Sequence, residues 1–156
     1  MIIAATHKGY YNSTEHSGAC QATTFAEDHP LRILIVEDNI INQKLIERIL
    51  HNLGYKTDTV SDGIKVFDML ASKKYNLILM DVRMPEMDGL EATQLIRKMS
   101  AEQPYIIAMT ANAMASDKEE CLQSGMNDYL SKPMRMEEIT KKLKIAASWV
   151  REENGN

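Results

Sequence analysis

Apolar and polar positions follow two different periods along most of this chain. Short apolar runs of the kind that form buried strands alternate with longer segments whose apolar residues repeat every three or four positions, as in amphipathic helices. The runs predict strands at residues 31–36, 55–60, 77–80, 105–109 and 128–131. Because a helical segment follows each strand, the pattern indicates five β/α units. Such units form a parallel sheet covered by helices on both faces.

The helical segments carry start and stop signals. The first, at 39–53, has Asn39 as a suitable N-cap and Gly54 as its end. Its apolar residues are Ile41, Leu45, Ile49 and Leu53 at spacings of four, with Ile46 and Leu50 beside them. Further helices are predicted around 66–70, at 89–99, from Ser116 to Gly125 with a capping box at its start, and at 136–150.

The periodic part of the chain defines its domain organisation. Residues 1–30 lack a sustained apolar period, and Pro30 ends any local helix, so they are expected to form a flexible leader or linker. Residues 31–150 form one α/β domain, and residues 151–156 are expected to be a frayed tail.

Composition excludes several classes of protein. A chain of 156 residues with a net charge of -4 offers no general basic field for nucleic acid, so no nucleic-acid partner is expected. No apolar run is long enough to span a membrane, and no membrane contact by this chain is expected. The two cysteines, Cys20 and Cys121, do not make a disulfide framework. A reducing compartment, the cytoplasm, is therefore the expected location.

Polar side chains stand at or just after the ends of four predicted strands. They are Glu37, Asp38, Asp81, Thr110 and Lys132. The carboxyl ends of parallel strands share one edge of a sheet, so these groups should converge there. Carboxylate oxygens suit Mg²⁺, and a metal, a lysine and a hydroxyl are what a phosphoryl group on Asp81 would need around its oxygens.

Four motifs then resemble one family in their order and content. They are VEDN at 36–39, MDVRMPEMDG at 80–89, MTANA at 109–113 and YLSKP at 129–133. Together they resemble the receiver (response-regulator) domain, in the style found in hybrid sensor histidine kinases. The resemblance implies a flavodoxin-like (CheY-like) fold, with a five-stranded parallel sheet in the order 2-1-3-4-5 and five helices over its two faces.

The resemblance also implies roles for the acidic residues. Asp81 is the expected phospho-acceptor, which takes a phosphoryl group from a phosphohistidine on a partner. Asp38 is the expected direct ligand of Mg²⁺, and Glu37 the acid that holds the ion through water. The backbone carbonyl of Arg83 would complete the metal shell.

Three further residues carry the conformational response that the resemblance implies. Lys132 is expected to pair with Asp81 and then with the phosphoryl oxygens, aimed by a cis bond to Pro133. Thr110 is expected to move to the phosphoryl group. Tyr129 would then swing inward, so that the domain is a switch with two arrangements.

The expected partner is a histidine kinase or a histidine phosphotransfer domain. Ile40 and Ile41 follow the acid pair directly, and both cannot easily face the core. We therefore expect this apolar start of the first helix to dock the helical phosphodonor. A homodimer formed on phosphorylation is left open by the sequence.

Other functions remain to be weighed against phosphorelay. A phosphatase with an aspartyl nucleophile would typically place a second Asp two residues after Asp81, where this chain has Arg83. A flavin module would need a phosphate-binding loop at 37–39, where the two acids would instead repel a phosphate. The remaining alternative is a degenerate receiver that acts only as a protein-binding module. The presence of the acidic, Thr and Lys positions argues against it.

Overall fold

A single five-stranded parallel sheet forms the centre of the computed structural model, which describes residues 23–99 and 102–155. The strand order is β2-β1-β3-β4-β5, and every neighbouring pair is parallel. The strands are β1 (Ile33–Val36), β2 (Thr57–Val60), β3 (Leu77–Asp81), β4 (Tyr105–Thr110) and β5 (Asp128–Ser131). This confirms the predicted flavodoxin-like fold and its strand order.

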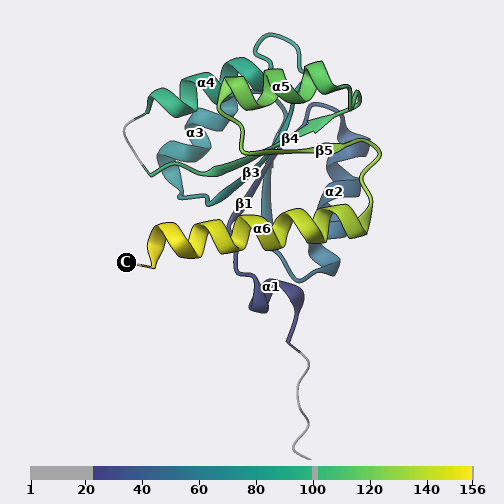
Figure 1. Cartoon of the computed structure of the whole chain (residues 1–156), viewed down its shortest axis with the longest axis vertical. Coiled ribbons are helices and arrows are strands. Elements are labelled where there is room, and N and C mark those ends of the chain that lie inside the picture. The colour runs from purple at the N-terminus through teal and green to yellow at the C-terminus, as the bar shows by residue number, and fades with distance from the viewer. Residues whose placement is uncertain (1–22, 100–101, 156) are drawn as a thin grey trace, which may run out of the picture.

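Helices lie on both faces of the sheet, as Figure 1 shows. The described residues form α1 (Phe25–Asp28), α2 (Ile40–Asn52), α3 (Lys65–Ser72), α4 (Gly89–Lys98), α5 (Ala115–Ser124) and α6 (Met136–Asn154). Residues of α3, α4 and α5 pack on one face, and residues of α1, α2 and α6 pack on the other. None of these helices is long and apolar enough to cross a membrane.

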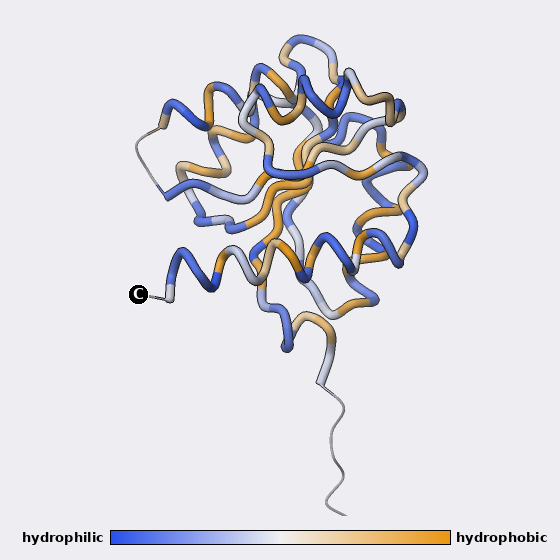
Figure 2. Tube along the Cα trace, in the orientation of Figure 1, coloured by the Kyte–Doolittle hydropathy of each residue, from blue (hydrophilic) through white to orange (hydrophobic). Residues whose placement is uncertain are grey.

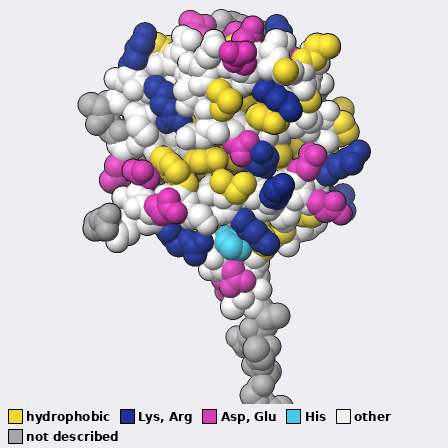
Figure 3. All heavy atoms as spheres, viewed as in Figure 1, with side chains coloured by type: hydrophobic (Ala, Val, Ile, Leu, Met, Phe, Trp, Pro, Cys, Tyr) yellow, Lys and Arg dark blue, Asp and Glu magenta, His cyan; other side chains and the backbone are white. Residues whose placement is uncertain are grey.

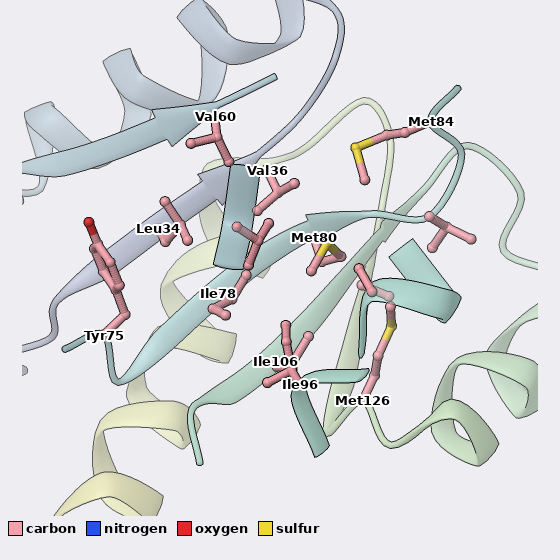
Figure 4. Close-up of a cluster of buried hydrophobic side chains, with 14 of the residues drawn as sticks. Leu34, Val36, Val60, Tyr75, Ile78, Met80, Met84, Ile96, Ile106 and Met126 are labelled. Atoms are coloured by element: carbon pink, nitrogen blue, oxygen red, sulfur yellow. The ribbon is translucent and has the colours of Figure 1, made fainter. Parts of the chain in front are cut away.

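Alternation along the central strands creates the two halves of the core. In β1, Leu34 and Val36 point to the α3–α4–α5 side, whereas Ile33 and Ile35 point to the opposite side. The strands β1, β3 and β4 are buried along their whole length, which is why they read as continuous apolar runs in the sequence. Figure 2 shows these strands as the most hydrophobic part of the trace. Figure 4 shows the cluster on the α3–α4–α5 side, where Met80 and Ile106 lie among the labelled residues.

Helix α2 buries a different face from the one predicted by its apolar residues at spacings of four. Ile41 is 74% exposed and Leu45 is 44% exposed. The buried positions of α2 are instead Gln43, Ile46 and Leu50. These three lie at spacings of three and four and share one face of the helix. A strict four-residue spacing drifts around a helix of 3.6 residues per turn, so this stripe is divided: Ile41 and Leu45 lie on the outer side, whereas Ile49 and Leu53 pack partly against the core.

The structure also differs from prediction at the two ends of the domain. Residues 25–28, expected to belong to a flexible leader, form α1, so the described helices number six rather than five. Phe25 packs against the α2–α6 side of the core, and its ring lies 4.7 Å from that of His29 and 6.3 Å from that of Tyr55. At the other end α6 runs to Asn154, four residues beyond the predicted stop and into the expected tail. Residues 1–22 and 156 lie outside the described residues.

The two ends of α5 show one prediction that fails and one that is confirmed. The helix begins at Ala115 with Met114 as its N-cap, and no side chain caps its start, so the predicted capping box from Ser116 is absent. Gly125 ends the helix with a φ of 105°, a left-handed conformation that glycine adopts at little cost.

Candidate metal centre and acid pocket

The sheet brings most of the predicted polar residues to one edge. Val36 pairs with Met80 in the next strand, so Glu37 and Asp81 follow as neighbours at the carboxyl ends of β1 and β3. Thr110 ends β4 and pairs with Ser131, which places Lys132 immediately beyond that edge. The parallel register therefore gathers groups from residues almost a hundred positions apart in sequence.

Three carboxylates form an acid cluster at this edge. Oxygen atoms of Glu37, Asp38 and Asp81 all lie within 4.8 Å of one another. Glu37 and Asp81 are buried, whereas Asp38 is exposed and opens the cluster to solvent. Lys132 is the cation of the cluster, with Nζ 2.7 Å from Glu37 Oε2 and 3.1 Å from Asp81 Oδ1.

The donor set fits a divalent cation. With all three acids ionised, the charge of Lys132 leaves the cluster two negative charges in excess. The ligand atoms are hard carboxylate oxygens, which Mg²⁺ prefers. Asp38 leaves a solvent-facing side through which a hydrated ion can enter.

Burial and the charge of Lys132 act in opposite directions on the pKa values of the two buried acids, and the balance differs between them. Burial raises the pKa of Asp81 to about 6; the negative charge of Glu37 adds to the rise, while Lys132 opposes it. For Glu37, burial also acts to raise the pKa. Hydrogen bonds from Lys132 and from the backbone of Asn39 outweigh it, and the pKa is lowered. Burial would lower the pKa of Lys132, but its ion pairs with Glu37 and Asp81 raise it.

Polar residues at the start of α2 hold Glu37 in place. Its Oε1 accepts hydrogen bonds from the backbone N–H of Asn39 at 3.1 Å and from the side-chain amide of Asn42 at 3.4 Å. The side-chain amide of Gln43 donates to the backbone carbonyl of Glu37. No motif in the sequence indicated a role at the site for Asn42 or Gln43. The available signal was Gln43 itself, a polar residue on the same helix face as Ile46 and Leu50.

The loop after Asp81 contacts its carboxylate and brings the start of α4 against its backbone. The backbone N–H of Arg83 donates to Asp81 Oδ1 at 3.2 Å. Glu86 has a φ of 67°, the left-handed region that a non-glycine residue seldom occupies, which marks a constrained turn. A Cβ atom at Gly89 would lie 2.2 Å from the backbone oxygen of Asp81, so only glycine fits at this position. The Lys132-Pro133 bond is cis, as predicted.

The side chains of Thr110 and Tyr129 make no hydrogen bond to the acid cluster, although the backbone oxygen of Thr110 accepts from the backbone N–H of Lys132 at 2.8 Å. The hydroxyl of Thr110 donates to the backbone oxygen of Asn112 at 2.9 Å and accepts from its N–H at 3.1 Å. Thr110 also borders a pocket of about 460 Å³ beneath the first turn of α5. Tyr129 is half-buried and lies at the edge of the α3–α4–α5 core, with ammonium groups of Lys118 and Lys142 over its ring.

Ile40 and Ile41 lie in the first turn of α2, next to Asp38. Ile40 is 59% exposed and Ile41 is 74% exposed, so neither side chain faces the core. Two exposed isoleucines beside an open acid cluster form an apolar rim to the site.

A larger hollow lies far from the acid cluster, at the amino ends of β1 and β2. It has a volume of about 610 Å³ and is bordered by the basic side chains of Arg32, Lys56 and Lys73. Its carboxylate, Asp58, is already bound by Lys73 at 3.0 Å and by the hydroxyl of Tyr75 at 2.6 Å. The acid of this hollow is therefore already paired, whereas the grouped carboxylates found among the described residues lie at the carboxyl edge of the sheet.

Fold and site together define an open α/β domain with an acid cluster, able to hold a metal ion, at the carboxyl edge of its sheet. Residues 33–144 match the family model of the response regulator receiver domain. The chain belongs to this family. The sensor histidine kinase RcsC of Escherichia coli is 39% identical over 126 residues, which cover 81% of this chain and 13% of that kinase. The chain thus matches only a small part of the length of such relatives.

Two solved structures resemble the fold closely. The receiver domain of the sensor histidine kinase PA1611 from Pseudomonas aeruginosa is 44% identical with a TM-score of 0.70, and the match covers 76% of this chain and 98% of that one. It holds a magnesium ion in its active site cleft. The receiver domain of Ssk1 from Saccharomyces cerevisiae, in complex with the histidine phosphotransfer protein Ypd1, is 31% identical with a TM-score of 0.67, covering 73% and 86% of the two chains.

Proposed function

We propose that this chain is a phosphorelay receiver that takes a phosphoryl group from a phosphohistidine onto Asp81. The supporting observation is that Lys132 bridges Glu37 and Asp81 within a three-carboxylate cluster of a chain from the receiver family. In the reaction a carboxylate oxygen of Asp81 forms a bond to phosphorus as the phosphorus–nitrogen bond breaks. The bonding electrons go to the imidazole nitrogen of the donor.

The residues around Asp81 supply positioning and charge for this transfer. Glu37, Asp38 and Asp81 would hold Mg²⁺, with the backbone carbonyl of Arg83 as a further ligand, and the ion would neutralise charge on the transferring phosphoryl oxygens. The ammonium of Lys132 lies 3.1 Å from Asp81 Oδ1, which supports a role for it in binding a phosphoryl oxygen carried by Asp81. The aspartate acts as a nucleophile only when ionised, so the proposal requires the metal and Lys132 to offset the cost of its burial.

The conformational response involves Thr110 and Tyr129. The phosphoryl group adds negative charge and strong acceptor oxygens at Asp81. In the proposal the hydroxyl of Thr110 leaves the backbone of Asn112 and donates to these oxygens. Tyr129 then turns inward, and the surface around β4, α5 and β5 changes.

The transfer and the later loss of the phosphoryl group are self-catalysed, so the proposed role is that of a switch rather than an enzyme acting on an outside substrate. Arg83 stands where a related phosphatase would carry an acid, which supports this choice. The match to a small part of RcsC supports the further proposal that the chain is a piece of a hybrid histidine kinase. A cytoplasmic location is part of the proposal, supported by the free thiol of Cys121.

The proposed partner is a histidine kinase or a histidine phosphotransfer domain. The Ypd1 complex of a related receiver supports this class of partner. The exposed Ile40 and Ile41 at the rim of the acid cluster offer a docking surface for an apolar helix face. A phosphorylation-dependent homodimer is left to experiment.

Phosphorylation by acetyl phosphate, read by intact mass, tests the proposal. Wild type should gain the mass of one phosphoryl group with Mg²⁺ and not with EDTA, and Asp81→Asn should gain none. A folded, metal-bound wild-type protein that gains no mass from acetyl phosphate or from a phosphorylated histidine phosphotransfer domain would refute the proposal. That result would favour a degenerate receiver that serves only as a binding module.

A further inference from the structure

Tyr129 lies on β5, at the edge of the core on the α3–α4–α5 side. Its strand neighbour is Ala108, the smallest side chain of β4. Ala108 and Thr110 share a face of the sheet because they lie two positions apart on one strand. The ring of Tyr129 packs only partly against the core on this face. Its resting position must therefore be held by contacts outside the core.

Two ammonium groups converge on this ring. Lys118 of α5 places its Nζ 4.5 Å from the ring centroid, and Lys142 of α6 places its Nζ at 5.0 Å. Both distances are within the range in which a cation is attracted to an aromatic face. Figure 3 shows the face over α5, β5 and α6, where basic and acidic side chains surround an apolar strip.

The two lysines are anchored very differently. Lys142 is fixed by an ion pair with Asp128, whose Oδ1 lies 2.6 Å from the ammonium. Within the part of the chain that the structure describes, Lys118 has no ion pair, and the ring of Tyr129 is its ammonium's contact. The ring thus couples the first turn of α5 to β5.

The first turn of α5 is weakly held at its own end. No side chain caps the helix, and its N-cap, Met114, is 63% exposed. The same turn carries Asp117, which borders the pocket of about 460 Å³ that Thr110 also lines. A movement of Thr110 therefore occurs directly beneath the turn from which Lys118 reaches Tyr129.

We propose that Lys118 is a positioning residue that holds Tyr129 outward in the resting domain, with Lys142 as the fixed support. This inference rests on the proposed switch function and names the contact that regulates it. When the first turn of α5 shifts, the ammonium of Lys118 leaves the ring and the inward position of Tyr129 becomes favourable. Through Lys118, the position of α5 affects the equilibrium between the outward and inward positions of Tyr129 in the resting domain.

Fluorine NMR of the whole chain labelled with 3-fluorotyrosine tests this inference. The Tyr129 resonance is assigned by its loss in Tyr129→Phe. Without any phosphodonor, Lys118→Met should raise the ratio of inward to outward Tyr129 by about 2- to 5-fold, the factor expected for the loss of one exposed cation–π contact. The solvent isotope shift of the resonance should fall, since the inward ring meets less water.

Two variants separate this contact from a general effect of charge. Lys118→Arg keeps a cation over the ring and should behave as wild type. Lys141→Met removes the same charge from an exposed position on α6 and should leave the resonance unchanged. A Lys118→Met resonance equal to that of wild type, or an equal shift in Lys141→Met, would overturn the inference.

The proposed function is tested separately in the same spectra. Beryllofluoride, a mimic of the phosphoryl group, should move the wild-type Tyr129 resonance in the direction that Lys118→Met moves it. If beryllofluoride has no effect on wild type, the proposed switch fails. In that case, the solvent isotope shift of the Tyr129 resonance is compared between Lys118→Met and Lys141→Met, both without beryllofluoride. This comparison still decides whether Lys118 holds the ring outward.

Discussion

The ammonium of Lys132 lies closer to Glu37, at 2.7 Å, than to Asp81, at 3.1 Å. Glu37 is fully buried and is held by the start of α2, so it anchors the lysine that must later serve a phosphoryl group on Asp81. The acid that resembles a metal ligand is thus also the resting partner of the lysine. Metal binding and the position of Lys132 should therefore respond together to changes at Glu37.

Glu37→Gln should weaken Mg²⁺ binding about 10-fold or more, because the variant removes one negative charge beside the metal site. The measurement is the Mg²⁺ concentration at which thermal stability rises halfway to its maximum. Glu91→Gln, on the exposed surface of α4, removes a carboxylate outside the cluster and should leave this concentration unchanged. Equal Mg²⁺ midpoints for Glu37→Gln and wild type would contradict a role for Glu37 in the metal site.

Asp81 should destabilise the metal-free domain at neutral pH. Burial raises its pKa from 3.8 to about 6, so between these values the folded state binds more protons than the unfolded state. Stability therefore falls as pH rises through this window, and the penalty is complete above the folded pKa. In EDTA, Asp81→Asn should exceed wild type in unfolding free energy by up to about 3 kcal/mol near neutral pH, with the difference closing toward pH 4.

Urea unfolding of both proteins across this pH range measures the effect, and Mg²⁺ provides the control. Addition of the ion should stabilise wild type, since it binds the folded state, and should have much less effect on Asp81→Asn. A stability difference that stays constant from about pH 4 to about pH 7.5 would show that ionisation of Asp81 is not its source.

Arg97 should be a large contributor to stability because four neutral acceptors surround its half-buried guanidinium. It donates to the backbone oxygens of Gly125 and Pro104, each at 2.8 Å, and to the side-chain oxygens of Asn127 at 2.7 Å and Gln103 at 3.1 Å. Arg97→Met would remove the guanidinium donor from the backbone oxygens of Gly125 and Pro104 and break the links to Asn127 and Gln103, at a cost of about 2–4 kcal/mol in urea unfolding.

Lys98→Met is the matched control for this prediction, since it removes a neighbouring cation from the exposed side of α4. Its unfolding free energy should stay within about 0.5 kcal/mol of wild type. Similar losses in both variants would show that positive charge at the end of α4, and not the hydrogen-bond network, is responsible.

Phe25 tests whether α1 belongs to the folded domain. The ring packs on the α2–α6 side of the core, the backbone N–H of Ala26 donates to Leu53 at 2.9 Å, and the hydroxyl of Tyr55 donates to His29 at 2.6 Å. Phe25→Ala should cost about 1–2 kcal/mol, less than a fully buried phenylalanine would. Thermal unfolding of Phe25→Ala beside Glu27→Gln, a change on the exposed side of α1, measures it. Equal melting temperatures for Phe25→Ala and wild type would indicate that α1 contributes nothing to the domain.

Ile40→Asp should separate partner docking from phosphorylation chemistry. The side chain is 59% exposed, so the change should leave stability and labelling by acetyl phosphate nearly as in wild type. Phosphotransfer from a phosphorylated histidine phosphotransfer domain should slow by about 10-fold or more, the effect of losing an apolar anchor at an interface. Ile64→Asp, at another exposed isoleucine, is the control and should transfer normally. Equal losses with both phosphodonors would refute the docking role of Ile40.

Patterns in the amino-acid sequence were sufficient to predict the fold and the edge of the sheet at which the polar residues gather. Short continuous apolar runs bounded by turn residues, such as that ending in Asp81, indicate strands buried on both faces, which is typical of a parallel sheet covered by helices. Parallel strands share one carboxyl edge, so Glu37, Asp81, Thr110 and Lys132 could be assigned to one edge from their positions alone. Gly125 could likewise be assigned to a helix end, because its role depends only on its own backbone.

The contacts among these groups depend on how the elements pack together in the folded domain. The choice of Lys132 between Glu37 and Asp81, the two lysines over Tyr129 and the acceptors around Arg97 depend on side chains from different elements, and no local pattern specifies such contacts. The buried face of α2 was decided in the same way. Its apolar residues nearly surround the helix, and only docking against β1 selected the side with Ile46 over the side with Ile41. The free energy of packing depends on the contacts between the surfaces of different elements. The buried face of a helix is therefore determined only when the helix packs against the sheet.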